Sequence, residues 1–414
     1  MSVINQVKDI FPESCWPDVW LVGGAVRDIL LNQPVQDIDL VAAIPPVQLE
    51  TVGFRPISPA SSSPIWFKYV PEIGKIEITV IDAPSHLKQD LRRRDFTINA
   101  LAMDLNGRVV DPLQGQSDLA SRQLRVCSEL SLQDDPIRIF RAFRFAADGW
   151  NLHSETIQQL GSQLWEDALS TIAVERFSRE LQKALARTQP EQFFRLMLQH
   201  NLGSSYLPEL FRMSEVPAGP QQYHPEGDLF THSLQVMQRV AAKSTAPLAR
   251  FCGFFHDLGK LETDPSLYPK HHGHDEAGFK PAQLLCERLR LPTAWQKALA
   301  WTCRLHTKAN NWEELRTTTK SRMAEQSAKA GIAEILPLVS SADKPDGSGM
   351  DGWETVLQVT AMTTAEMGID LDAFQQMPVE HRAGYLLQRR VELLKIVMTP
   401  YPKSGKHPIS LQGT

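Results

Sequence analysis

The segment LVGGAVRDILLNQPVQDIDLV, residues 21–41, constrains the fold of this chain more than any other feature. An apolar run leads into Gly23-Gly24 and a helical pattern, and a strand-like segment follows that carries Asp37 and Asp39. Glycines between a strand and a helix let phosphate oxygens approach the backbone near the positive end of the helix. On a strand, residues two apart point to the same face, so both carboxylates could hold one Mg²⁺ ion, or two close together. The segment predicts a nucleotide site that contains a metal ion.

Each of these features is weak when it stands alone. A Gly-Gly pair is more often a tight turn, and an isolated Asp-x-Asp is more often a solvated strand end. Their combination in one strand-helix-strand unit favours function. A third carboxylate, Glu77, lies in KIEITVI, whose period-two alternation predicts a half-buried strand, and it could complete the metal site.

Two further segments carry groups suited to a nucleotide. LRRRDFTINALAMD, residues 91–104, offers Arg94, Asp95 and Asn99, which could contact a triphosphate and a ribose hydroxyl, although an arginine run can also be a solvated helix start. DDPIRIFRAFRFAA predicts a helix with an aspartate cap and a proline in its first turn. It would place Asp135 and Arg138 one turn apart, either as a surface ion pair or as a pair that hydrogen-bonds a base edge. Spacing alone leaves both alternatives open.

The periodicity of hydrophobic residues divides the chain into an α/β part and a helical part. Up to about residue 125 strand patterns alternate with helices, and AMDLNGRVVDP predicts a hairpin with a type I′ turn at Asn106-Gly107, which needs φ > 0 at both residues. From Asp134 onward helical periodicity dominates. VPAGPQQYHPEGD, residues 216–228, predicts a linker, and a final pair of helices follows residue 350.

Composition excludes several classes of protein. The net charge of −5 means that a nucleic-acid partner would need a local basic face. The five cysteines lack Cys-x-x-Cys spacing, which argues against a thiolate zinc site. The first residues lack the pattern of a signal peptide, and no apolar run reaches the length of a membrane span. We therefore expect a cytoplasmic protein with no membrane contact and no obligate protein partner.

Six blocks, taken together, resemble the bacterial tRNA nucleotidyltransferases of class II, the CCA-adding enzymes related to bacterial poly(A) polymerases. They follow in that family's order between residues 19 and 190: LVGGAVRD, DIDLV, RRRDFTINALAMD, DPLQGQSDLASRQLR, DDPIRIFRAFRFAA and ERFSRELQKAL. The resemblance implies an α/β nucleotidyltransferase head, with a mixed antiparallel sheet and helices, followed by an all-α body. It also implies that Asp37 and Asp39 bind the catalytic Mg²⁺, with Glu77 as the third catalytic carboxylate.

The resemblance further implies the nucleotide-binding residues. Arg94 and Asp95 would meet the triphosphate and sugar, and Asp135 and Arg138 would select CTP or ATP without a nucleic-acid template. The full expected nucleotide-binding set is Gly24, Arg27, Arg94, Asp95, Asn99, Asp135, Arg138 and Arg141.

Three departures from the family pattern matter. The usual Glu-Asp before the selecting helix is Asp134-Asp135 here. The basic block of the poly(A)-forming relatives is replaced by GFRPISPASSSPIWF, which ranks poly(A) polymerase lower. Only ITVIDAPSHLKQDL, residues 78–91, separates Glu77 from the arginines, and Asp82 stands where an arginine is usual. The long flexible loop of most members is missing, a feature that resembles the CC-adding members.

The histidine-rich region resembles the HD domain fused to longer members of the family. THSLQV, FFHDLGK and SADKPDG supply His232, His256, Asp257 and Asp343, a ligand set that suits a transition metal such as Ni²⁺ or Mn²⁺ and would support phosphatase or cyclic phosphodiesterase chemistry. A structural His-Asp hydrogen bond is the alternative. YPKHHGHDEAG adds three histidines that could bind phosphate, support the metal ligands or simply lie on the surface: His271, His272 and His274.

The sequence thus predicts an Mg²⁺-dependent enzyme that adds two cytidines from CTP to the tRNA 3′ end and uses ATP poorly. The full CCA-adding enzyme is the first alternative, and an HD phosphohydrolase with a nucleotide- or RNA-binding head is the second. Two sets of candidate metal ligands argue against a protein that senses nucleotides without catalysing a reaction. The expected parts are a nucleotidyltransferase head (1–125), a helical neck and body with the selecting helix (126–215), an HD phosphohydrolase domain (216–350) and a helical tail (351–414).

Overall fold

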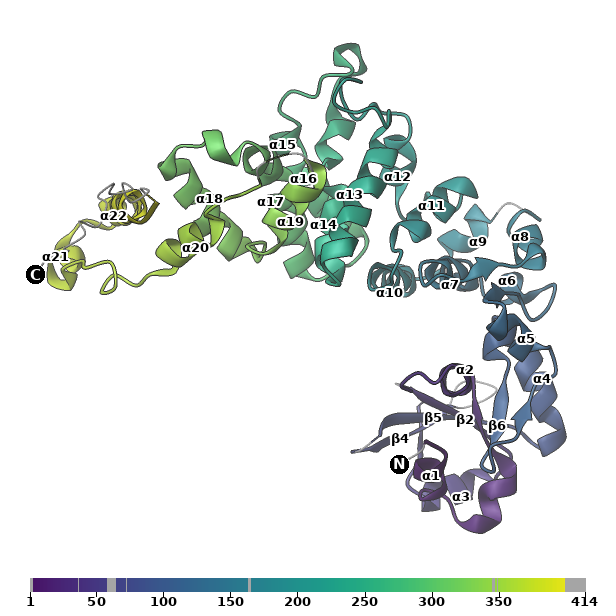
Figure 1. Cartoon of the computed structure of the whole chain (residues 1–414). Helices are drawn as coiled ribbons and strands as arrows, with labels where there is room; N and C mark the ends of the chain where they lie inside the picture. The colour runs from purple at the N-terminus through teal and green to yellow at the C-terminus, as the bar shows by residue number, and fades with distance from the viewer. Residues whose placement is uncertain are drawn as a thin grey trace, which may run out of the picture. The chain divides into compact units, whose positions relative to one another are not determined.

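The computed structural model describes residues 3–35, 37–57, 65–71, 73–162, 165–344, 347 and 349–398. It divides into two compact units, Met1–Pro208 and Glu209–Thr414 (Figure 1). Residues 58–64, the serine-rich middle of the segment that replaces the basic block, lie outside the described residues.

The first unit begins with a mixed seven-stranded sheet in the order β3-β4-β5-β2-β1-β6-β7. Neighbouring strands are antiparallel except β2 and β5, which are parallel. A separate parallel pair, β8 and β9, follows. The strands are β1 Val19–Val22, β2 Ile38–Ala42, β3 Arg55–Pro56, β4 Ile65–Val70, β5 Gly74–Val80, β6 Ala102–Asp104, β7 Val109–Val110, β8 Gln123–Leu124 and β9 Asn151–Leu152.

Alternation along the strands builds an apolar core on each face of the sheet. Leu40 belongs to the core that also contains residues of α1 and α3, whereas Val41 belongs to the core that contains Leu87 and Leu91 of α4. Because residues two apart share a face, Asp39 lies on the same face as Val41, towards α4. The chain leaves α4 directly into the arginine block, so the packing of this helix carries those arginines to the carboxylates.

The predicted hairpin between β6 and β7 is present, but its predicted turn type is wrong. Gly107 has a φ of +84°, whereas Asn106 is not among the described residues with positive φ. The amide of Gly107 donates to the Asp104 carbonyl at 2.9 Å, and the Asp104 carboxylate accepts from the amides of Asn106 and Arg108. These side-chain hydrogen bonds stabilise a turn with a single left-handed residue, at glycine.

A helical body completes the first unit. Phe140 of α7, Phe177 of α10 and Phe193 of α11 form one aromatic core that holds these helices together. The helices are α1 Val3–Lys8, α2 Gly24–Leu30, α3 Pro46–Thr51, α4 Leu87–Arg92, α5 Gly115–Ala120, α6 Ser131–Asp134, α7 Ile137–Ala146, α8 Ser154–Leu160, α9 Glu166–Ser170, α10 Val174–Leu185 and α11 Glu191–Gln199, with α12 Pro208–Met213 at the boundary between the units.

The aspartate cap predicted for the selecting helix does not form. Pro136, not an aspartate, occupies the N-cap of α7, and no side chain caps the helix. Asp135 has an extended backbone (φ −151°, ψ 97°) and lies before the helix. Its carboxylate instead accepts a hydrogen bond from Arg176 at 2.7 Å, and this charged partner outcompetes the backbone amides.

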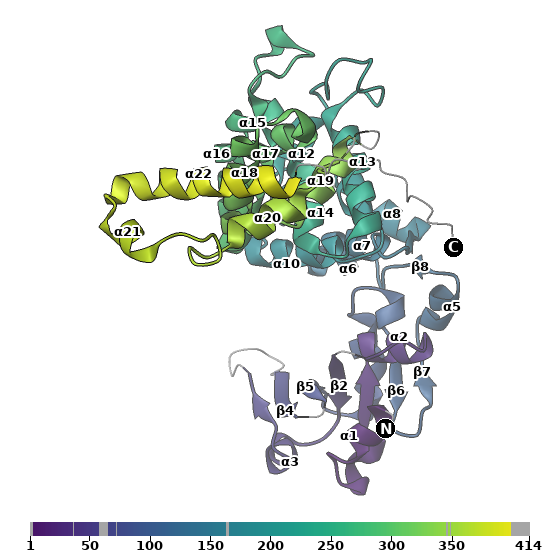
Figure 2. The ribbon, with the colours of Figure 1, turned by 60° about the vertical axis from the view of Figure 1, so that its left-hand side comes forward.

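The second unit is helical, and α13, α14, α17 and α19 pack against one another at its centre (Figures 1 and 2). Short 3₁₀ turns, η4 Leu258–Glu262 and η5 Pro265–Leu267, follow α14. The helices are α13 Leu229–Lys243, α14 Pro247–Phe255, α15 His274–Ala277, α16 Phe279–Arg288, α17 Thr293–Asn310, α18 Thr317–Ala330, α19 Ile335–Asp343, α20 Trp353–Ala361, α21 Leu371–Gln376 and α22 Val379–Met398.

The segment 216–228 is not the linker that its Pro and Gly content predicted. Val216 and Ala218 are buried, and the Ala218 amide donates to the Gly227 carbonyl at 2.9 Å while the Leu229 amide donates to the Val216 carbonyl at 2.8 Å. The segment is an ordered loop within the second unit, whose boundary lies earlier, at Pro208.

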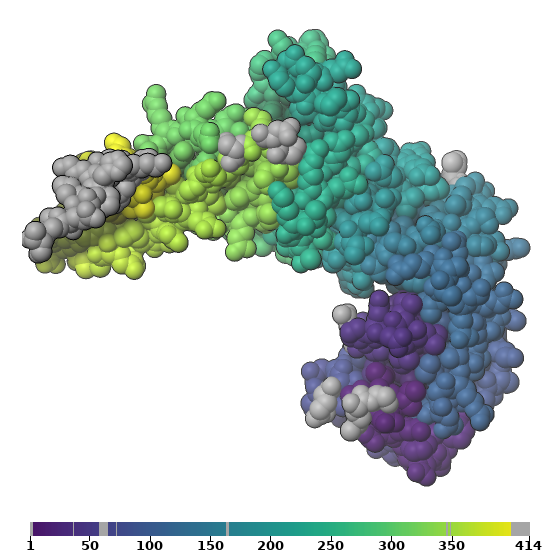
Figure 3. Space-filling model, in the orientation of Figure 1, coloured from purple at the N-terminus to yellow at the C-terminus, as the bar shows by residue number. Residues whose placement is uncertain are grey.

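The C-terminal part contains three helices where the sequence suggested two. The long helix α22, labelled in Figure 2 and in the yellow end of the colour range in Figure 3, packs on α18 and α20, yet only Leu394 within it is buried. Among the described residues, no helix combines the length and apolar character needed to cross a membrane.

Candidate active site and metal centre

The carboxylates of the head come from two neighbouring parallel strands. Asp39 of β2 lies directly beside Glu77 of β5, and Asp37, just before β2, lines the same cavity as Asp39. Burial raises the pKa of Asp39, and the negative charges of Glu77 and Asp37 raise it further, whereas Arg94 and Arg141 lower it. Crowded carboxylates of this kind suit a hard divalent cation such as Mg²⁺, because its charge offsets their repulsion.

The three carboxylates do not converge equally in this structure. Asp37 and Asp39 line one cavity of about 650 Å³, whereas the carboxylate of Glu77 contacts the ammonium of Lys75 on its own strand. Among the described residues, the head carboxylates do not form a set of three ligand atoms within 4.8 Å of one another. Asp37 and Asp39 are therefore the pair that faces the cavity.

Gly23 permits a close approach at the start of α2. It has a φ of +67°, and a Cβ atom there would lie 2.9 Å from the guanidinium of Arg94 and 3.9 Å from a carboxylate oxygen of Asp39. The Gly23 amide itself donates to the Leu101 carbonyl at 3.1 Å. The glycine thus leaves open the space in which the helix start, Arg94 and Asp39 meet.

Asp95 is the centre of a buried hydrogen-bond network. Arg141 donates to one oxygen of Asp95 from two nitrogens, at 2.8 and 2.6 Å, and Asn99 donates to the other at 3.0 Å. Burial alone would raise the pKa of Asp95, but Arg141, Asn99 and the Phe96 amide together lower it to about 2. Arg27 donates to the Asn99 side-chain oxygen at 2.7 Å, so the network reaches from α2 to α7.

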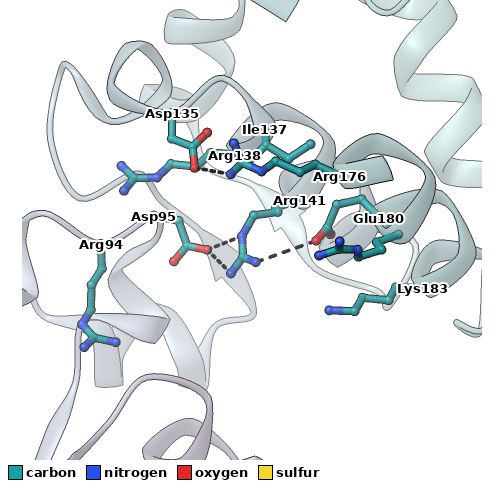
Figure 4. A pocket seen from close by; sticks show the side chains of 10 residues that line it. Arg94, Asp95, Asp135, Ile137, Arg138, Arg141, Arg176, Glu180 and Lys183 are labelled. Carbon is teal, nitrogen blue, oxygen red and sulfur yellow. Dashed lines mark hydrogen bonds and ion pairs between the residues drawn. The ribbon is translucent and has the colours of Figure 1, made fainter. Parts of the chain in front are cut away.

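Asp135 and Arg138 line a second cavity of about 430 Å³ without forming a pair with each other (Figure 4). Asp135 accepts from Arg176 of α10. Arg138 donates to the Arg93 carbonyl at 2.7 Å and to the carbonyl and hydroxyl of Ser131 at 2.9 and 3.1 Å. Asp135 and Arg138, both described residues, therefore do not form the surface ion pair that their spacing allowed.

A basic stripe on α10 faces the same cavity and was missed by the sequence analysis. Arg176, Arg179 and Lys183 follow one another at helical spacing, and Glu180 between them accepts from Arg144 at 2.5 Å. Figure 4 shows Arg176, Glu180 and Lys183 beside side chains of α7 and Asp95. The i, i+3, i+7 spacing of the three cations in ERFSRELQK was available to sequence reasoning as a basic helix face.

In the second unit, four predicted ligands meet although they come from three separate helical segments. His232 lies on α13, His256 and Asp257 follow α14, and Asp343 ends α19. His232 Nε2 lies 3.0 Å from Asp343 Oδ1 and 3.6 Å from Asp257 Oδ2. His256 Nε2 lies 3.2 Å from Asp257 Oδ2 and 3.6 Å from Asp343 Oδ1.

Hydrogen bonds at the far ring nitrogens orient both imidazoles. Nδ1 of His232 lies 2.7 Å from a carboxylate oxygen of Glu226, and Nδ1 of His256 lies 2.9 Å from the Gly253 carbonyl. Because these oxygens accept, each Nδ1 carries a proton and each ring directs its Nε2 into the cluster. Both Nε2 atoms are buried without a hydrogen-bond partner, as a ligand position for a divalent transition metal requires.

The carboxylates also set the electrostatics of the cluster. Burial lowers the pKa of His256, but Asp257 and Asp343 raise it to about 10. Burial raises the pKa of Asp257, but its charged neighbours lower it well below the usual value. The strongest of these neighbours is Lys260, which donates to Asp257 at 2.6 Å. The negative charge concentrated here fits a bound cation.

The loop histidines have three different environments. His271 lies with one ring nitrogen 2.8 Å from the Pro217 carbonyl, and His272 is exposed. His274 reaches the cluster, where it meets Asp257 and His306 of α17. Sequence reasoning did not single out His306 or Glu226, because neither stands in a motif; a lone histidine on a long helix carries no spacing information.

Comparison with known families agrees with both units. A family model described as the Poly A polymerase head domain matches residues 19–60 and 67–125, and an HD domain model matches residues 229–344.

Solved structures share the fold. The chain is similar to the Bacillus stearothermophilus CCA-adding enzyme in complex with CTP (TM-score 0.63, 21% identity, 97% of this chain and 89% of that chain). It is also similar to the Thermotoga maritima CCA-adding enzyme complexed with tRNA (TM-score 0.61, 21% identity, 91% and 87%).

Two relatives align in sequence with most of the chain. A Multifunctional CCA protein of Mannheimia succiniciproducens is 32% identical and covers 91% of this chain and 98% of the relative. A protein of the same name from Legionella pneumophila (strain Lens) is 35% identical over 74% of this chain and 79% of the relative. The chain therefore belongs to the multifunctional CCA protein family and is a nucleotidyltransferase of the CCA-adding kind with an HD domain.

Proposed function

We propose that the head adds cytidines from CTP to the 3′ end of tRNA, stops after the second, and depends on Mg²⁺ held by Asp37 and Asp39. The bound ion would neutralise the triphosphate and favour attack by the terminal hydroxyl of the tRNA. The relatives named above bear the name Multifunctional CCA protein, and the solved neighbours hold CTP or tRNA. The cavity-facing aspartate pair next to Gly23 and Arg94 supports the same reaction.

The remaining head residues would bind and orient the nucleotide. We assign the triphosphate to Arg94, to Arg27 and to the start of α2 at Gly24, because guanidinium groups and helix N-termini favour phosphate oxygens. Asp95 stays ionised and orients Arg141, and Asn99 bridges Asp95 to Arg27. The catalytic carboxylates are Asp37 and Asp39, with Glu77 joining them if its contact with Lys75 opens.

Restriction to cytidine rests on one observation, the anchoring of Arg138. Its guanidinium is held by the Arg93 carbonyl at 2.7 Å and by Ser131. A change from cytosine to adenine requires Asp135 and Arg138 to present a different donor pattern to a larger base. Arg93 directly follows α4, and only Ile81 to His86 separate β5 from that helix, so no long segment is available to move the anchor.

The full CCA-adding enzyme is the competing function, favoured by the names of the relatives. The deciding experiment incubates the pure protein with tRNA that lacks its last three nucleotides, together with CTP and ATP, and sequences the 3′ ends. We expect mostly CC ends. Mostly CCA ends would refute the restriction while leaving the tRNA nucleotidyltransferase assignment intact.

For the second unit we propose a metal-dependent phosphohydrolase, with His232, His256, Asp257 and Asp343 as ligands of a divalent transition metal such as Ni²⁺ or Mn²⁺. When bound, the metal would activate water for attack on a phosphoester. The two buried Nε2 atoms without hydrogen-bond partners carry this proposal. Hydrolysis of p-nitrophenyl phosphate and of a 2′,3′-cyclic nucleotide, measured with Ni²⁺, Mn²⁺, Co²⁺ and Mg²⁺ in turn, tests it.

The two proposed functions imply a division of the chain into four parts. We propose that residues 1–125 form the nucleotidyltransferase head, 126–215 the neck and body with the selecting helix α7, 216–350 the HD part and 351–414 a helical tail. The alternative of an HD phosphohydrolase with a head that only binds nucleotide or RNA is not supported, because the chain belongs to a family of CCA-adding nucleotidyltransferases.

A further inference from the structure

The groups proposed to bind the triphosphate lie on one side of β2, the strand that carries Asp39. In the sheet, β1 and β6 lie on this side of β2, whereas β5 and β4 lie on the other (Figure 2). Gly23 follows β1 and Asn99 precedes β6, and a Cβ atom on Gly23 would lie 2.9 Å from the guanidinium of Arg94. The triphosphate-binding groups therefore gather at β1 and β6.

The geometry of nucleotidyl transfer fixes the side from which the RNA must arrive. The attacking oxygen and the leaving oxygen lie roughly in line, on opposite sides of the transferred phosphorus atom. Because the triphosphate-binding groups lie on the β1 and β6 side of Asp39, the hydroxyl of the RNA 3′ end approaches from the side of β5 and β4. The last nucleotides of the RNA would therefore lie over these two strands.

On that side, β4 presents a row of apolar and aromatic side chains. Phe67 pairs with Glu77, which pairs with Asp39, so the three residues form a row across three strands on one face. Ile65 and Tyr69, two residues away in each direction, share this face and are 42% and 70% exposed. Neither core of the sheet, as the described residues form it, contains these three β4 residues. The catalytic face thus carries an aromatic surface that is open to solvent.

The spacing of this row suits RNA. Neighbouring strands lie about 4.8 Å apart, so Phe67 is about 10 Å from Asp39 across the sheet, a distance that a ribose and its base span together. Phe67 and Tyr69 are about 7 Å apart along β4, and aromatic side chains on a sheet surface stack successive bases in RNA-binding domains. Stacking tolerates any base, because every base has an aromatic face.

A lysine beside the aromatic row offers a charge to the RNA backbone. Lys75 Nζ lies 5.9 Å from the centre of the Phe67 ring, and the same ammonium contacts the carboxylate of Glu77. Lys75 is exposed, so its ammonium can turn from Glu77 to a phosphate of the RNA. This movement would free the Glu77 carboxylate to join Asp39 at the metal ion.

We propose that Phe67 and Tyr69 form a stacking surface for the 3′ end of the RNA substrate, with the terminal base on Phe67 and the preceding base on Tyr69. The surface would hold the terminal hydroxyl beside Asp39 and Glu77 for attack on CTP. A second copy of the chain could also cover an apolar strip, but the continuity of this strip with the catalytic carboxylates favours RNA. The proposal rests on the metal position proposed above and extends it to the second substrate.

The test measures the addition of one cytidine to tRNA that lacks its last two nucleotides and so ends in two unpaired bases. We expect Phe67→Ala and Tyr69→Ala each to raise KM for this tRNA about tenfold, because one base loses its stacking partner, and to leave KM for CTP unchanged. Phe67→Tyr and Tyr69→Phe keep an aromatic ring and should retain the wild-type KM. Tyr223→Ala, at an exposed tyrosine of the second unit, is the matched control and should change neither constant.

An abasic tRNA end distinguishes stacking from a change in the fold. Removing the terminal base should raise KM about tenfold for the wild type and no further for Phe67→Ala, whose ring is already gone. An equal additional rise in both proteins would overturn the stacking surface. A wild-type dimer that Phe67→Ala dissociates in gel filtration, with an unchanged KM for tRNA, would overturn it as well and assign the face to a second copy. Phe67→Leu, which keeps an apolar side chain without an aromatic ring, replaces Phe67→Ala if circular dichroism shows that the alanine variant has not folded.

The activity of Asp39→Ala separates this inference from the function on which it rests. Wild-type incorporation by Asp39→Ala, together with the raised KM in the two aromatic variants, would overturn the metal position and keep the stacking surface. Loss of incorporation by Asp39→Ala, together with an unchanged KM in Phe67→Ala and Tyr69→Ala, would keep the metal position and overturn the stacking surface.

Discussion

At the scale of single residues, the head site uses two carboxylates in opposite ways. Burial and acidic neighbours raise the pKa of Asp39, so a bound cation would stabilise its charged form. Asp95 already contacts the cationic side chain of Arg141, which keeps its carboxylate ionised. The first is suited to bind metal, the second to hold a structure in place.

Replacing Asp39 by Ala should lower the rate of CTP incorporation by several orders of magnitude, because the carboxylate proposed to hold Mg²⁺ is lost. Glu77→Ala should cost less, since its carboxylate is turned towards Lys75. Single-turnover incorporation into truncated tRNA measures both. Glu50→Ala, at an exposed position of α3, is the control, and equal losses for Glu77→Ala and Asp39→Ala would show that all three carboxylates act together.

Asp95→Asn should destabilise the protein in a pH-dependent way. The folded pKa of Asp95, about 2, lies below its ordinary value of 3.8, so its ionised form stabilises the fold above about pH 4, and this contribution is lost as the pH falls through 2. The shift corresponds to on the order of 2 kcal/mol. Urea unfolding of wild type and variant should show a gap at pH 7 that shrinks between pH 4 and pH 2.

The exposed Asp9→Asn serves as the control for that series and should unfold like the wild type at every pH. A gap of the same size at pH 7 and near pH 2 would mean that Asp95 contributes through packing and not through its charge.

At the scale of elements, short segments position groups that belong to distant parts of the chain. α4 brings the arginine block onto the face of the sheet that carries Asp39. α10 lays a basic stripe along the cavity that contains Asp135 and Arg138. η4 and α15 touch at Gly259, and this contact brings His274 close to Asp257.

The basic stripe should contribute to tRNA binding through phosphate contacts. Arg179→Gln and Lys183→Gln should each weaken binding and reduce the slope of log Kd against log salt by about 1, because each phosphate contact releases roughly one counterion. Fluorescence anisotropy over a salt series measures both quantities. Lys280→Gln, exposed on α16, is the matched charge control; a slope unchanged in both stripe variants would exclude α10 from the tRNA interface.

Gly259→Ala should destabilise the second unit, because the added Cβ atom cannot fit against the His274 carbonyl and η4 and α15 must separate. Urea unfolding should therefore begin at a lower denaturant concentration than in the wild type. Gly384→Ala, in α22 where a Cβ atom meets nothing within 4 Å, is the matched control and should not lower the stability. An unchanged unfolding curve for Gly259→Ala would show that the segments can adapt to the methyl group.

At the scale of the whole molecule, the chain carries two chemical sites in two compact units. The residues proposed for nucleotide addition all lie before Pro208, and those proposed for hydrolysis all lie after Glu209. Each unit has its own buried core, so a local defect in one need not reach the other.

This separation predicts a reciprocal loss of activities. His256→Ala should abolish metal-dependent phosphoester hydrolysis and leave cytidine addition within about twofold of the wild type, because its ligand role is confined to the second unit. Asp39→Ala should do the reverse. Parallel assays of both activities on the two variants test this, and loss of cytidine addition in a well-folded His256→Ala protein would reveal coupling between the units.

The sequence by itself determined the elements and the residues that are neighbours along the chain. Gly23-Gly24 at the start of a helix, Asp37 and Asp39 at the start of a strand, and His256-Asp257 after a helix all follow from local periodicity and short spacing, which fix the face on which a side chain lies. Helical periodicity predicted the helical body, and the resemblance carried by the six sequence blocks implied the mixed sheet of the head. Where local chemistry offered two solutions, as at the turn at Asn106 and the cap at Asp135, the pattern alone chose wrongly.

Only the tertiary structure decided which distant side chains meet. Arg141 reaches Asp95 across 46 residues of chain, and Arg138 reaches the Arg93 carbonyl across 45. His306 joins Asp257 because α14 and α17 pack together, and no motif marks it. Such contacts depend on the burial of whole helix faces against one another, and their partners are fixed by packing over long range, which local patterns do not encode.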